Sequence, residues 1–179
     1  MVLLDIVVLL IVAYFTWYLA TDYRTFAGRE QIPFVLWVID TIDLFIHEGG
    51  HFFFGFFGRL IYFLGGSLMQ IVIPSLAVWV FLKSGARTLI WTLYWLGQNL
   101  VNVSVYISDA PYRRLPLISE SAIHDWNWIF GYLGHMEMAG PVSTVVFVLG
   151  IGACLGGVVM AGYFLFADFV DAFVQKENV

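Results

Sequence analysis

Long apolar runs separated by short polar stretches are the feature that most restricts the fold of this chain. A membrane-spanning helix needs about 20 mostly apolar residues, and several runs of this kind occur here. Hydrophobic residues make up 61% of the 179 residues and charged residues only 12%, whereas about 25% of a soluble domain is charged. Because so few charges cannot cover a water-exposed surface, the composition excludes most soluble classes and predicts an integral membrane protein.

The apolar runs predict one all-α membrane domain over residues 1–179, a polytopic bundle of about five to six transmembrane helices in the cell membrane. Three parts follow from their spacing: a three-span core at 32–110, a polar loop at 109–126 and C-terminal membrane segments at 127–170. The expected helices cover residues 2–20, 32–57, 67–82, 86–108 and 140–166, with a short segment at 126–138. Gly65 and Gly66 are expected in the turn before the third helix.

The charge balance bears on the partners of the chain. Eight Lys and Arg residues stand against 13 Asp and Glu residues, which gives a formal net charge of −5. Nucleic-acid-binding proteins usually carry a basic patch, and none is evident in this sequence. We therefore expect the lipid bilayer and a membrane protein substrate as partners, and no nucleic acid.

The sharpest chemical signal is the pentapeptide His47-Glu48-Gly49-Gly50-His51. On a helix, residues i and i+4 share one face, so both imidazoles can reach one ion. Zinc accepts two such nitrogens and a carboxylate, and it leaves a fourth position for water. The intervening Glu48 can take a proton from that water. Ionisable side chains inside a membrane helix are costly and suggest function, so the motif predicts one catalytic Zn²⁺ with Glu48 as the general base.

The remaining site residues are inferred from helix geometry. Asp43 lies one turn before His47 and is a candidate for accepting the second N–H of that imidazole, a contact that metal-bound histidines usually need. The helices at 32–57 and 86–108 run in the same direction, so Asp109 at the end of the latter approaches the same membrane face as His51. Asp109 is thus the expected third metal ligand, and Asn102 on its helix face can hydrogen-bond within the site. His124 in the polar loop is the alternative: it can replace Asp109, supplement it or bind substrate.

Together these residues resemble the site-2 protease family, which are intramembrane zinc metalloproteases. The resemblance covers roughly residues 42–117 and rests on the His-Glu-Gly-Gly-His motif, on Gly65-Gly66-Ser67-Leu68-Met69-Gln70 with Pro74, and on Ser108-Asp109-Ala110. It looks like the small bacterial branch, without accessory domains. The resemblance implies that His47, His51 and Asp109 bind zinc, that Glu48 is the general base, and that Asn102 stands near the family's membrane asparagine. The spacing from Asn102 to Asp109 departs from the family pattern, and the proline expected between them is absent.

The function that we expect is a zinc metalloendopeptidase that cleaves membrane-embedded or membrane-proximal substrates through a zinc-activated water. Two other classes compete with it. A zinc-binding membrane protein without proteolysis, such as a sensor or scaffold, needs no general base and usually closes its site with four protein ligands. A transporter usually contains paired structural repeats, and none is visible in the sequence.

Overall fold

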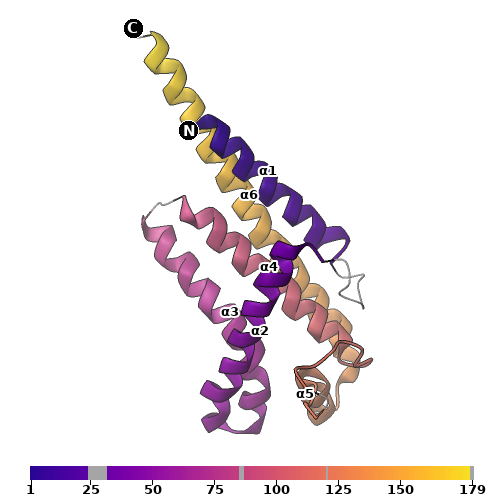
Figure 1. Cartoon of the computed structure of the whole chain (residues 1–179). Coiled ribbons are helices and arrows are strands. Elements are labelled where there is room, and N and C mark those ends of the chain that lie inside the picture. Colours follow the sequence, from indigo (N-terminus) through magenta and orange to yellow (C-terminus); the bar gives the residue numbers. More distant parts are fainter. Residues whose placement is uncertain (24–31, 85–86, 120, 178–179) are drawn as a thin grey trace.

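The structure is a computed structural model that describes residues 1–23, 32–84, 87–119 and 121–177. These residues form helices and loops, with no strand among them, which confirms the all-α prediction. Both chain termini lie at the same end of an elongated bundle, and the short helix α5 (Asp125–Leu133) lies near the opposite end (Figure 1). The site described below is at the α5 end.

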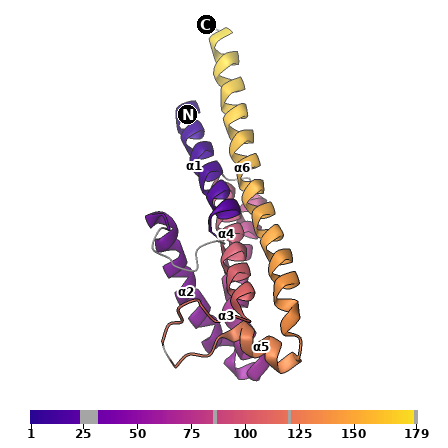
Figure 2. The ribbon, with the colours of Figure 1, turned by 90° about the vertical axis from the view of Figure 1, so that its right-hand side faces the viewer.

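Three helices form the apolar part of the bundle: α1 (Val2–Thr21), α4 (Thr88–Asp109) and α6 (Ala139–Glu177). α6 packs along both α1 and α4 and extends beyond them toward the C-terminus (Figure 2). Glycines allow α4 and α6 to approach closely, because a Cβ on Gly97 would lie 2.6 Å from the Gly150 carbonyl oxygen. At the terminal end, Arg87 forms ion pairs with Asp5 of α1 and Asp168 of α6.

A second pair of helices, α2 (Phe34–Phe54) and α3 (Arg59–Ser84), is joined by the short helix η2 (Gly55–Phe57). Gly58 has a φ of 95°, a value that favours glycine, and it turns the chain between η2 and α3. The prediction that Gly65 and Gly66 form a turn is wrong, since both lie inside α3. They serve packing instead: a Cβ on Gly50 of α2 would lie 2.2 Å from the Gly65 carbonyl oxygen.

The chain between α4 and α5 forms a loop that extends toward α2 (Figure 2). Its anchor is Asp109, whose two carboxylate oxygens accept the backbone N–H groups of Arg114 and Leu115 at 3.0 and 2.9 Å. After α5, the helix η3 (Met136–Met138) leads into α6. The loop thus returns the chain from the end of α4 to the α2–α3 pair and delivers the first residue of α5 there.

Among the described residues, three helical segments are long and apolar enough to cross a membrane: Val2–Thr21, Arg59–Ser84 and Met136–Val174. This agrees with a membrane protein, while the larger number of five to six spans stays a prediction. Helices α2 and α4, with 21 and 22 residues, are also long enough to cross a membrane. Unlike the three apolar segments, however, they carry most of the buried polar side chains. Those side chains reduce the apolar character of both helices, and they build the site.

Candidate metal site

Two imidazoles and one carboxylate meet where α2 approaches the start of α5. His47 and His51 lie one turn apart on α2, and Asp125 is the first residue of α5. Ligand atoms of the three side chains all lie within 4.8 Å of one another, and all three residues are buried. The Asp125 Oδ2 atom is 2.9 Å from His47 Nε2 and 3.3 Å from His51 Nε2. This group can bind a metal ion.

The hydrogen bonds of the two Nδ1 atoms determine whether the Nε2 atoms, which face Asp125, carry a proton or a lone pair. His51 Nδ1 is 2.8 Å from the backbone carbonyl oxygen of Tyr62, so it must donate there. His47 Nδ1 is 2.8 Å from Gln70 Oε1, which also accepts. A neutral imidazole carries one N–H, so both Nε2 atoms then present lone pairs. Metal-binding histidines have this arrangement, with the far N–H held by an acceptor.

Three acceptors consequently point at one place: the two Nε2 lone pairs and the Asp125 carboxylate. Acceptors that converge without a proton between them repel, unless a cation lies there or an imidazole is protonated. A divalent metal satisfies all three at once, and two nitrogens with one carboxylate are a donor set that suits zinc. The donor chemistry of the site therefore fits the metal ion predicted from the sequence.

The electrostatics of Asp125 agree with a role as a charged ligand. Burial by itself raises the pKa of its carboxyl, but the imidazoles of His47 and His51, which attract the carboxylate when they are protonated, outweigh burial and leave the pKa below its usual value. The carboxylate is therefore held in its ionised form, which is the form that binds metals.

Glycine in α3 makes room for the first imidazole. A Cβ on Gly66 would lie 2.3 Å from His47 Nε2, far inside van der Waals contact. Gln70, one turn further along α3, is oriented by two amides of α4: its Nε2 donates to Asn99 at 3.5 Å and to Asn102 at 3.4 Å. Because both of these hydrogen bonds use the NH₂ group of Gln70, the Oε1 atom is the one that faces His47.

Asp43 and Asn102 lie in the polar layer behind the site rather than at it. Asp43 accepts from Trp95 Nε1 at 3.0 Å and from Asn99 Nδ2 at 3.2 Å, whereas Gln70 holds the second nitrogen of His47. The role expected for Asp43 thus belongs to Gln70, because the glycines of α3 bring that helix against the imidazole while Asp43 faces α4. Asn102 donates to the Tyr23 hydroxyl at 2.7 Å and lines the cavity described below.

Asp109 and His124, the two candidates for the third ligand, are not in the three-residue group. Asp109 anchors the loop after α4. His124 is the N-cap of α5, where Nδ1 accepts the backbone N–H of Asn127, and its Nε2 is 3.4 Å from Asp109 Oδ2. Burial lowers the pKa of His124, although the nearby Asp109 opposes that effect. Asp125, the residue that joins the imidazoles, follows His124 directly. The sequence did not single it out, because an acidic residue in the first turn of a helix is common: it interacts favourably with the helix dipole whether or not it binds a metal.

The site opens into a cavity of about 500 Å³. Its polar wall includes the three ligand candidates, Glu48, Gln70 and Tyr106, and residues 115–118 and 121–123 of the loop cover it. Glu48 is half-buried there, and the structure gives it no hydrogen bond or ion pair to another described residue. A volume of this size is typical of small-ligand and peptide sites. Space for a reacting group is thus available beside the three converging acceptors.

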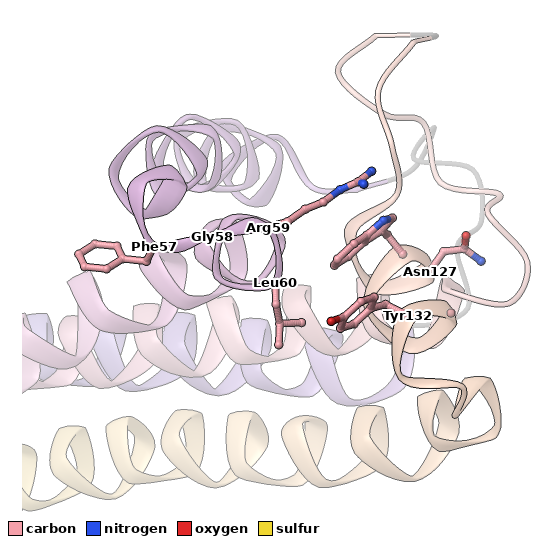
Figure 3. A pocket seen from close by; sticks show the side chains of 8 residues that line it. Phe57, Gly58, Arg59, Leu60, Asn127 and Tyr132 are labelled. Atoms are coloured by element: carbon pink, nitrogen blue, oxygen red, sulfur yellow. The ribbon is translucent and has the colours of Figure 1, made fainter.

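A second cavity, of about 690 Å³, lies between the start of α3 and α5 (Figure 3). Arg59 and Leu60 at the start of α3 line one wall, and Asn127 and Tyr132 of α5 line the other (Figure 3). Arg59 lies 5.0 Å from the centre of the Trp128 ring, a cation–π distance. Although this cavity is larger, it contains no carboxylate or imidazole, so the chemistry of the chain is concentrated in the first one.

No protein-family model matches the chain, and no curated protein or solved structure is significantly similar to it.

Proposed function

We propose that the chain is an intramembrane zinc metallopeptidase similar to the site-2 proteases. The observation that carries the proposal is the convergence of His47 Nε2, His51 Nε2 and the Asp125 carboxylate at the wall of a cavity that also holds Glu48. Three protein ligands with adjacent space are typical of a catalytic zinc site, whereas structural sites usually have four. The non-proteolytic zinc protein that competes with this function is therefore less well supported.

We also propose that α2 and α4 cross the membrane, which makes the chain a multi-pass protein of the cell membrane. Helix α2 has the residue distribution that lipid requires. Phe45 and Phe52 are exposed on its outside at 70% and 81%, while Asp40, Asp43 and His47 are buried. Ionisable side chains inside a membrane face the bundle interior or a polar cavity, and α2 follows that rule.

In the proposed reaction, bound zinc would polarise the scissile carbonyl and lower the pKa of a water to about 7. Asp125, His47 and His51 would hold the ion, and Gln70 and the Tyr62 carbonyl keep the imidazoles in the ligating tautomer. A carboxylate oxygen of Glu48 takes the proton of the attacking water and delivers it to the leaving amine. A helical substrate has to unwind locally before cleavage, because its carbonyls are hydrogen-bonded inside the helix.

The test pairs metal analysis with a search for cleavage products. The purified wild type and Glu48→Gln are assayed for bound zinc by elemental analysis, then incubated with a library of peptides from single-span membrane proteins, and new N-termini are identified by mass spectrometry. We expect both proteins to hold about one zinc and only the wild type to cleave. Absence of zinc from the wild type, absence of zinc-dependent products, or equal cleavage by both proteins would contradict the proposal.

A further inference from the structure

Tyr106 of α4 is held rigidly at the site by two imidazoles. The edge of its ring packs on His47, with ring centres 5.7 Å apart and an interplanar angle of 71°. Its face stacks on His124, with centres 4.2 Å apart and an angle of 28°. These two contacts restrict the ring, and Tyr106 lines the cavity wall.

One half of the hydrogen-bonding capacity of that hydroxyl is already used. Its oxygen accepts the backbone N–H of Asp125 at 3.0 Å. Within the described part of the chain, the proton then has only Asp125 Oδ2 as an acceptor, at 3.4 Å, which is long for an O–H···O bond of about 2.7–2.8 Å. A metal ion bound to Asp125 competes for the same oxygen and weakens this contact further. The hydroxyl thus offers a positioned proton next to the ligand carboxylate.

Peptide hydrolysis needs a donor of this kind. As water attacks, negative charge develops on the carbonyl oxygen, and a fixed hydrogen-bond donor beside that oxygen stabilises the transition state. Among the described residues that line the cavity, Gln70 donates to the two asparagines and Asn102 donates to Tyr23. Tyr106 is the one whose hydroxyl lies within hydrogen-bond distance of a member of the three-residue group.

We propose that Tyr106 is a catalytic residue whose hydroxyl donates a hydrogen bond to the carbonyl oxygen of the scissile peptide as charge develops on it. The proposal rests on the peptidase function above. The step is a hydrogen bond and leaves the proton on Tyr106, while Glu48 carries the proton that moves. The two roles fall to different helices: Glu48 of α2 accepts the proton of the water, and Tyr106 of α4 donates a hydrogen bond to the carbonyl oxygen.

The variant Tyr106→Phe removes only the oxygen and keeps both ring contacts. Tyr94→Phe is the matched control, because Tyr94 lies on the same helix but is buried in the apolar cluster away from the cavity, and its hydroxyl has no hydrogen bond among the described residues. We expect Tyr106→Phe to lower kcat by about 10²–10³-fold, the usual effect of losing one such donor, with KM and zinc affinity unchanged. Tyr94→Phe should stay within about twofold of the wild type by comparison with that effect.

A binding measurement separates this proposal from the peptidase function. A phosphinic peptide, in which a tetrahedral phosphinate replaces the scissile carbonyl, is titrated into the zinc-loaded proteins by calorimetry. We expect Tyr106→Phe to weaken its binding at least about tenfold, as expected for loss of a transition-state donor. Unchanged phosphinate binding would overturn the catalytic role. So would a fall in zinc affinity with unchanged kcat per bound zinc, which would make Tyr106 a support for Asp125. If the wild type binds the phosphinate but cleaves nothing, the peptidase function fails while the hydrogen bond is still measured.

Discussion

The α2–α3 pair and the α4–α6 pair use the same packing device for different purposes. In both, glycine lets a neighbour come closer than a Cβ would allow. Gly97 of α4 receives the backbone and side chain of Cys154, whereas Gly66 of α3 receives the imidazole of His47. The first contact brings two apolar helices together, and the second reserves space for a ligand ring. The same residue type therefore stabilises the bundle in one region and positions chemistry in the other.

The surroundings of the two regions differ in the same way. The α1–α4–α6 part buries an apolar cluster that includes Val12, Leu19, Val101 and Cys154. The α2–α3–α4 part instead buries amides and carboxylates that bond one another, so an unpaired group there costs more than a lost apolar contact. We expect changes in the polar region to alter metal binding, and changes in the apolar region to alter stability alone.

The largest expected effect is the loss of a ligand. Asp125→Ala should lower zinc affinity by more than the roughly 10–100-fold typical of outer partners, while Asp109→Ala should lower it less, through the loop. Zinc affinity of both purified variants is measured by competition with a chelator. The reverse ranking would return Asp109 to the position of third ligand that the sequence suggested.

The next effect compares the two glycines directly. Gly66→Ala should displace the His47 ring and abolish most zinc binding, because the new Cβ would occupy the space of Nε2. Gly97→Ala should cost about 1–3 kcal/mol of stability through overpacking, with zinc affinity of the folded protein unchanged. Thermal unfolding and zinc titration of both variants are the measurements. Normal zinc binding by Gly66→Ala would show that the two regions do not differ in this way.

A smaller effect is expected at Gln70. Replacing it with Leu removes the acceptor of the His47 N–H and should weaken zinc binding about 10–100-fold. Gln98→Leu is the control, because Gln98 donates to Asp40 on the same polar side of α4 but does not contact the imidazoles. Equal losses of zinc affinity in the two variants would indicate a general loss of packing rather than a specific contact.

The smallest expected effect is a difference in stability between substitutions of the two neighbouring glycines of the motif, Gly49 and Gly50. Gly50→Ala should destabilise the protein because its Cβ would meet the backbone of Gly65, whereas a Cβ on Gly49 meets nothing within 4 Å. Gly49→Ala should therefore be neutral or stabilising by up to about 1 kcal/mol, the helix preference of Ala over Gly. Thermal unfolding of the two variants in the same detergent gives the comparison, and equal midpoints would contradict it.

The sequence by itself determined the class of the molecule and the two imidazoles of the site. Apolar runs define helices because their side chains and backbone bonds are local, and the spacing of His47 and His51 puts both on one helix face. These inferences need no knowledge of how the helices pack.

Only the tertiary structure decided which carboxylate joins the imidazoles and which residues hold them. Asp109 and Asp125 lie at the two ends of the polar loop, and the path of that loop brings Asp125 to the imidazoles. Gln70 reaches His47 because Gly65 and Gly66 lie inside α3 and let two helices meet closely, a contact between residues 23 positions apart. Contacts of this kind depend on where the chain returns in space, and no local pattern of residues records that.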